Sequence, residues 1–146
     1  MSERNLLTTS RFLLEIDGII QAGFSEVTIP ESSVEIIQYR NGDDAPIMRN
    51  IAGQQKVTPL ILKTGMTFDG AASLELANWH KDIVNGKISR KNVSIIIQDQ
   101  EGREGARFNI INGIASKYTI SPLNSKNNEI AIETLEIANE GITRAK

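Results

Sequence analysis

The sequence contains no cysteine, a single histidine and a single tryptophan, and aromatic residues account for 5% of its 146 residues. Without cysteine the chain can form neither a disulfide bond nor a thiolate metal site. Catalysis of the Ser-His-Asp kind would depend on His80, whose neighbours on a predicted helix do not present a base to a distant nucleophile. Asp43, Asp44 and residues 99–104 lack the spacing of a calcium loop. We therefore predict no enzyme, no cofactor and no metal site, with His80 at a surface or an interface.

An excess of one charge and long apolar runs are also missing. Sixteen basic residues and eighteen acidic residues leave a formal net charge of −2, which argues against a nucleic acid or an anionic membrane as a partner. No run approaches the roughly 20 apolar residues of a membrane-spanning helix, and residues 1–11 lack the apolar core of a signal peptide. We expect a soluble chain that does not use the Sec route, with a single domain over residues 1–146.

One stretch has a clear helical pattern. Its apolar stripe consists of Ala72, Leu76, Trp79 and Ile83. This spacing predicts an amphipathic helix with the stripe against the core. Asp69 is placed to cap its start, and Gly86 is placed to end it in a left-handed conformation. Trp79 is predicted to lie in the core, with a subunit contact as the alternative.

The rest of the chain consists mainly of short stretches that alternate in polarity, which predicts β-strands. The predicted strands cover residues 12–17, 24–29, 33–39, 57–67, 93–98, 106–114, 116–120 and 129–139. Glycines in residues 99–105 predict a hairpin turn. The apolar parity of the last strand shifts near Glu133 and Thr134, which predicts a β-bulge there. With a single helix the predicted fold class is mainly β, an antiparallel barrel or sandwich with one flanking α-helix.

Two segments are predicted to lie outside this domain core. Residues 1–10 form a possible N-terminal arm, in which Leu6 and Leu7 could anchor on a neighbour. Residues 40–56 are rich in turn-forming residues and predict a long loop. The apolar residues of the loop are Ile47, Met48 and Ile51. They indicate that the loop either folds over its own domain or docks on a neighbouring subunit.

Two further features bear on assembly. A basic cluster, formed by Lys87, Arg90 and Lys91, follows the helix. It is either a solvated turn that complements the helix C-terminus or a surface that pairs with acids of an adjacent subunit. The strands near Ile96 and Ile111 are apolar on both faces, so we expect another layer or a neighbouring subunit to cover them.

Several segments together resemble the phage tail tube protein family, which includes inner-tube subunits of contractile injection systems. The strongest resemblance lies in residues 78–87 followed by residues 90–95. Further segments agree in order at residues 12–18, 22–27, 63–67, 116–119 and 128–138. Residues 48–56 depart from the family, whose members often have more glycine and proline there.

The resemblance implies a structural protein with a fold similar to the hemolysin-coregulated proteins of type VI secretion. It implies hexameric rings that stack into a hollow tube for DNA or protein cargo, assembled in the bacterial cytoplasm as part of a phage tail or extracellular injection particle. The implied partners are copies of the chain and the sheath, baseplate or spike proteins of the particle. The candidate contact residues between subunits are Leu6, Leu7, Asp43, Asp44, Ile47, Met48, Ile51, Lys87, Arg90 and Lys91.

Two alternatives stay open at the level of the sequence. Within the same family, a tube-initiating or tail-end paralogue would form a single ring on the spike. From another class, a monomeric β-barrel could bind a small ligand in its interior.

Overall fold

The computed structural model describes residues 11–17, 19–24, 26–40, 42, 48–65, 71–99, 101–122 and 131–146. Within them the elements, in chain order, are β1 (Arg11–Ile16), β2 (Ile19–Phe24), β3 (Glu26–Thr28), β4 (Ser32–Tyr39), β5 (Arg49–Val57), β6 (Leu60–Gly65), α1 (Ala71–Val84), β7 (Lys91–Gln98), β8 (Glu104–Ile120), β9 (Ile132–Ala138) and β10 (Gly141–Arg144). The predicted class, mainly β with one helix, is confirmed.

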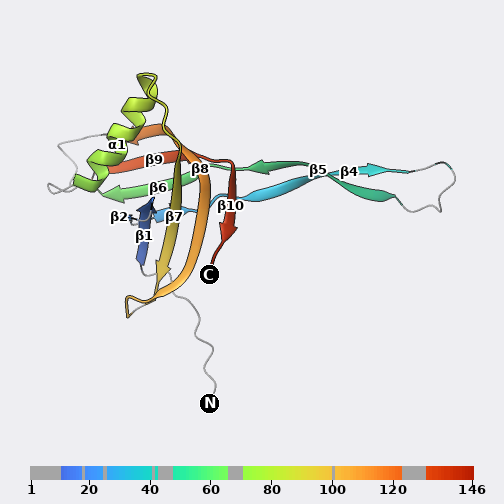
Figure 1. The fold of residues 1–146 in the computed structure, drawn as a ribbon, viewed down its shortest axis with the longest axis horizontal. Helices are drawn as coiled ribbons and strands as arrows, with labels where there is room; N and C mark the ends of the chain where they lie inside the picture. The colour runs from blue at the N-terminus through green and yellow to red at the C-terminus, as the bar shows by residue number, and fades with distance from the viewer. Residues whose placement is uncertain are drawn as a thin grey trace, which may run out of the picture.

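The main sheet closes into a barrel (Figure 1). Its strand order is β2-β1-β7-β8-β9-β6-β3, and all neighbours are antiparallel. One residue separates β2 from β3, so the two ends of this strand path belong to the same stretch of chain. Within the described residues no ladder joins β2 to β3. This stretch of chain instead passes from pairing with β1 to pairing with β6, and so links the two ends of the sheet.

β8 is the longest strand, with 17 residues, and it joins the two halves of the barrel. Its first part pairs with β7 and β10, and its second part pairs with β9. The sequence predicted two strands here, separated at Ala115. The structure instead has a shift of register between Ala115 and Lys117 within one strand.

The predicted bulge near Glu133 and Thr134 is wrong, because both residues pair with β6 in an unbroken register. A bulge lies instead on the neighbouring strand β8, at residue 116. No extra residue is needed in β9, since Glu133 itself occupies an inward position together with Leu135 and Ile137. The apparent slip of the apolar pattern thus reflects a buried carboxylate.

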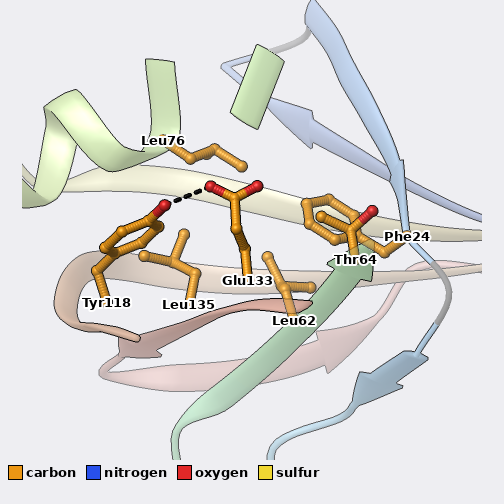
Figure 2. Close-up of a pocket in the computed structure, with 7 residues that line it drawn as sticks. All are labelled: Phe24, Leu62, Thr64, Leu76, Tyr118, Glu133 and Leu135. Atoms are coloured by element: carbon orange, nitrogen blue, oxygen red, sulfur yellow. Dashed lines mark hydrogen bonds between the residues drawn. The ribbon is translucent and has the colours of Figure 1, made fainter. Parts of the chain in front are cut away.

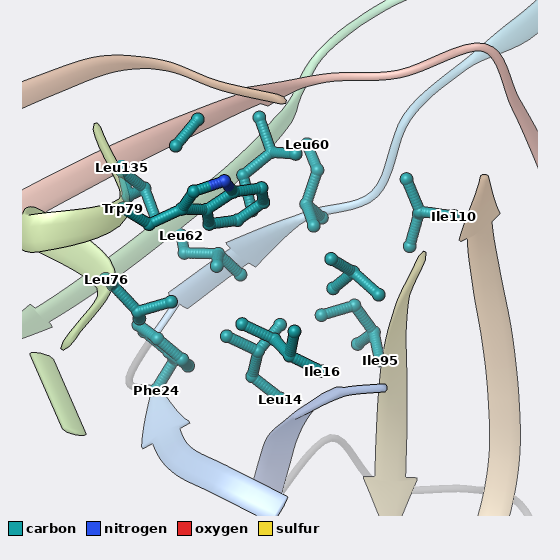
Figure 3. Packing of buried hydrophobic residues seen from close by; sticks show 13 residues of the cluster. Leu14, Ile16, Phe24, Leu60, Leu62, Leu76, Trp79, Ile95, Ile110 and Leu135 are labelled. Carbon is teal, nitrogen blue, oxygen red and sulfur yellow. The ribbon is translucent and has the colours of Figure 1, made fainter. Parts of the chain in front are cut away.

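α1 packs its apolar stripe against the interior of the barrel (Figure 3). Leu76 and Trp79 are each only 4% exposed, and Ile83 is partly buried against the same cluster. The indole N–H of Trp79 donates to the carbonyl oxygen of Ser89 at 3.0 Å. The core position predicted for Trp79 is therefore confirmed. Burial of a large apolar side chain of this kind contributes about 1.5–3 kcal/mol to stability.

The helix ends as the sequence predicts. Gly86 has a φ of +89°, which is the left-handed conformation that glycine adopts at low cost. The N–H of Lys87 donates to the carbonyl of Asp82 at 2.8 Å, and the N–H of Gly86 donates to the carbonyl of Ile83 at 3.1 Å. This pair of bonds is a Schellman motif. The predicted cap, Asp69, lies outside the described residues.

A second sheet, formed by β4 and β5 alone, extends away from the barrel (Figure 1). We call these two strands the hairpin. The prediction of a loop over residues 40–56 is wrong for residues 49–56, which belong to β5. That stretch is mostly polar and contains Gly53, so its own pattern does not predict a strand. Its extended conformation comes from pairing with β4, as in the registers Tyr39 to Arg49 and Ile37 to Ile51.

Two shorter strands were not predicted. β2 forms because Asp17, at a φ of 51°, turns the chain back against β1. β10 pairs with β8 beyond the corner at Asn139 and Glu140, and the N–H of Glu140 donates to the carbonyl of Ile111 at 2.9 Å. Both strands are short. A tight turn holds β2 against β1, and a partner distant in sequence, β8, holds β10.

The conformation of Gly86 generates a stability prediction. Replacement Gly86→Ala should lower the free energy of unfolding by about 1 kcal/mol, because an alanine Cβ is strained at positive φ. Chemical denaturation measures the change. The matched control is Gly42→Ala, where an added Cβ meets open space. Equal destabilisation by the two substitutions would contradict the assignment.

Candidate assembly interface

The hairpin exposes apolar side chains along its length. All eight residues of β4 are exposed. The most exposed apolar side chains of the hairpin and the residue before β5 are Val34 at 46%, Ile36 at 56%, Ile37 at 49%, Ile51 at 45% and Met48 at 51%. Monomeric proteins rarely expose many apolar side chains close together, so this group marks the hairpin as a candidate contact surface.

This apolar surface covers both faces of the hairpin. Ile37 lies directly opposite Ile51 in the ladder, so the two share one face. Val34 and Ile36 differ from Ile37 in strand parity and lie on the other face. Within the described part of the chain neither face is covered, so the hairpin presents two apolar sides to a partner.

The hairpin is anchored at its base. The N–H of Thr58 donates to the carbonyl of Glu31 at 3.0 Å, and the N–H of Glu31 donates to the hydroxyl of Thr58 at 2.7 Å. Farther out, a Cβ on Gly53 would lie 3.1 Å from the Ile37 side chain and from the carbonyl of Glu35. Glycine at this position therefore lets Ile37 lie flat across β5. An isolated two-stranded hairpin is marginally stable in water, which indicates that a partner supplies further contacts.

The basic cluster contacts its own chain. Arg90 forms a 3.1 Å ion pair with Glu140, and Glu140 also accepts from the Asn112 side chain at 2.8 Å. The Lys91 ammonium lies 5.5 Å from the centre of the Trp79 ring, a cation–π distance. Lys87 is exposed. The pairing of this cluster with an adjacent subunit stays a prediction, and Lys87 is the member best placed for it.

The outward face of β1, β7 and β8 carries a group of paired polar side chains beside apolar ones, because Leu13 and Ile96 lie in the same row as Arg107. Arg107 donates to both carboxylate oxygens of Glu15, at 3.1 and 3.3 Å, and to Glu104 at 2.6 Å. These hydrogen bonds, that to Glu104 first, raise the pKa of Arg107 above its usual value. Beside them the Ser94 hydroxyl donates to Asn109 at 2.8 Å. The side chains thus form a hydrogen-bonded polar group, the polar wall, in which one guanidinium faces two carboxylates.

Beneath α1 the barrel contains a buried polar pair. The hydroxyl of Tyr118 donates to Oε1 of Glu133, which is 7% exposed (Figure 2). Burial, followed by this hydrogen bond and the charge of Glu133, raises the pKa of Tyr118 to about 12. His80 lies at the neighbouring junction of α1 and β8, where its Nδ1 contacts the carbonyl oxygen of Ala115 at 2.8 Å. The predicted surface or interface histidine is therefore partly buried.

The sequence profile of the family described as T4-like virus tail tube protein gp19 matches residues 8–143. The chain belongs to this family. The match confirms the predicted family and identifies a structural protein rather than an enzyme. No curated protein sequence matches the chain.

Solved structures show the fold of this tail tube protein in other particles. The chain is similar, with a TM-score of 0.82 and 19% identity over 96% of this chain and 91% of the other, to a chain in the sheath-tube complex of the extracellular contractile injection system PVC. A chain in the PVC sheath/tube terminator is similar with a TM-score of 0.84 and 19% identity, over 99% of this chain and 100% of the other. Hcp1 from Salmonella typhimurium is similar with a TM-score of 0.57 and 14% identity, over 92% of this chain and 84% of the other. The predicted likeness to hemolysin-coregulated proteins holds for the fold.

Apart from the basic cluster described above, the contact residues predicted for the tail tube protein fall into two groups. Leu6, Leu7, Asp43, Asp44 and Ile47 lie outside the described residues. Met48 and Ile51 are exposed at the hairpin. The sequence analysis did not name Val34, Ile36 and Ile37 as contacts, although the apolar residues on both faces of the predicted strand at 33–39 were a usable signal.

Ile96 and Ile111, the two residues predicted to need a cover on the barrel surface, differ in exposure. Ile96, expected to need a covering layer, is only 4% exposed, whereas Ile111 is 41% exposed.

Across the described ranges no group of three or more acidic or histidine side chains could hold a metal ion. In the same part of the tail tube protein, no helix has the length and apolar character to cross a membrane.

The Tyr118–Glu133 pair predicts how stability depends on pH. The folded pKa of Tyr118, about 12, lies above its ordinary value of 10.0, so folding favours the neutral phenol. This stabilisation is complete below pH 10 and is lost as the pH rises to 12. In denaturation experiments, Tyr118→Phe should remove this part of the loss of unfolding free energy between pH 10 and 12. Tyr39→Phe, on the exposed hairpin, is the control and should keep it.

Proposed function

We propose that copies of this tail tube protein close into six-membered rings, which stack into the hollow inner tube of a contractile phage tail or a phage-tail-like injection system. The tube carries DNA or protein cargo. The exposed apolar hairpin is the single observation that supports assembly most directly, because it leaves two uncovered sides on an otherwise closed barrel.

The proposed role of the hairpin is to dock on a neighbouring subunit. Its apolar side chains are about half exposed, so burial of the remaining surface of each would contribute about 1 kcal/mol. A segment that projects from one subunit and contacts a different surface of the next makes a heterologous interface. Such an interface gives a ring when the rotation closes. Along the tube axis, the hairpin and the N-terminal arm with Leu6 and Leu7 are the proposed ring-to-ring contacts.

The polar wall around Arg107 is the proposed lumen surface. The ion pairs of Arg107 with Glu15 and Glu104 hold these charges in fixed positions. Polar side chains that already pair with one another leave few free partners for a moving cargo, which suits passage rather than binding.

The proposed partners are sheath and baseplate proteins of the same particle. Similar chains occur in a PVC sheath-tube complex and in the anti-feeding prophage baseplate, the latter with a TM-score of 0.74 and 15% identity over 99% of this chain and 97% of the other. The particle is proposed to assemble in the bacterial cytoplasm. The proposed sheath contact lies on the outer side of the ring.

Negative-stain microscopy of the purified protein tests the proposal. We expect annular particles with sixfold symmetry that stack into tubes as the concentration rises. Isolated rings that never stack would instead assign the chain to a tube-initiating or tail-end role. A particle that stays monomeric at high concentration would contradict assembly and favour a barrel that acts alone.

Charged substitutions on the hairpin provide a sharper prediction. Ile36→Asp and Ile37→Asp place a carboxylate on opposite faces, so each should abolish tube formation if that face is covered by a neighbour. Asn78→Asp introduces the same charge at an exposed polar position of α1, outside the hairpin, and is the matched control. Sedimentation measures assembly.

Thermal melts of the barrel serve as the folding control for these variants. Because the substituted side chains are about half exposed in the single subunit, the melting temperature of the monomer should change little. Tubes of normal length from both Ile36→Asp and Ile37→Asp would exclude the hairpin as the assembly contact.

A further inference from the structure

Glu133 places a carboxylate inside the barrel, at a position where its neighbours on β9 are apolar. The residue shares the inward face with Leu135 and Ile137 and is 7% exposed. Tyr118 donates to Oε1, but Oε2 is buried and has no hydrogen-bond partner within the described part of the chain. A buried acceptor left without a partner costs about 1–3 kcal/mol, so folded proteins rarely contain one.

The Glu133 carboxylate lines a small cavity between α1 and the sheet (Figure 2). The apolar side chains that form its walls are Phe24, Leu62, Leu76 and Leu135. Thr64 and Tyr118 supply the hydroxyl groups of the lining. The cavity therefore combines an apolar wall with the unpartnered oxygen and two hydroxyl-bearing side chains.

The size and the donor set of the cavity limit what it can hold. The space open to the centre of a water molecule is about 10 Å³, which corresponds to one water molecule. A calcium or magnesium ion takes six or more oxygen ligands, whereas this lining offers one carboxylate and two hydroxyl groups. A water molecule can donate to a carboxylate and still contact a hydroxyl group.

We propose that the cavity binds one buried water molecule, which donates a hydrogen bond to Oε2 of Glu133 and contacts the hydroxyl of Thr64. The water links β9 to β6 directly beneath Leu76 of α1. It completes the hydrogen bonding of Glu133, so that the carboxylate can occupy an inward position without an unpaired oxygen.

High-resolution structures of the wild type and of Glu133→Met test the proposal. Methionine keeps a similar length but removes the acceptor. We expect a density peak within about 2.5–3.2 Å of Oε2 in the wild type and none at that place in the variant. A dry wild-type cavity, or a peak that persists in Glu133→Met, would overturn the proposal. The wild-type density decides the question even if the variant does not fold.

A double-mutant cycle tests whether Thr64 shares the water with Glu133. Thr64→Val should shift the melting temperature by a smaller amount in the Glu133→Met background than in the wild type, since the bridging water is already lost there. Thr119→Val, at an exposed position, is the matched control and should give equal shifts in both backgrounds. Equal shifts for Thr64→Val as well would remove Thr64 from the site.

Discussion

The structure depends on one constraint, the return of the main sheet to its own starting strand. β2 pairs with β1, and β3, one residue later in the chain, pairs with β6. This junction turns an open, twisted sheet into a barrel and encloses the apolar side chains of every strand on the path. α1 adds Leu76 and Trp79 to the same core, so a single hydrophobic interior holds both the strands and the helix.

Closure of the barrel also explains why the hairpin is the exposed part. The strands of the main sheet pair along one continuous path, while β4 and β5 pair only with each other. Their apolar side chains cannot reach the interior and remain at the surface. A tail tube protein of this shape thus separates two tasks, since the barrel provides stability and the hairpin provides surface for assembly.

Hydrogen-bonded polar groups set the local details within this frame. The Tyr118–Glu133 pair occupies the space beneath α1, and the Arg107 network with Glu15 and Glu104 joins β1 to β8 on the outer face. Hydrogen-bonded charges in fixed positions favour one register over its alternatives. The apolar core alone, made largely of leucine, isoleucine and valine, specifies register less strongly.

The sequence by itself determined the elements whose signals are local. The periodicity around Trp79 determined the helix, Gly86 determined its end, and alternation determined most strands, so the class and the family followed. Only the tertiary structure decided that residues 49–56 form a strand, since their polar side chains gain an extended partner in β4. It also decided that Glu133 faces inward, because the pattern of one strand does not reveal the phenol of Tyr118 that the paired strand β8 places beside it.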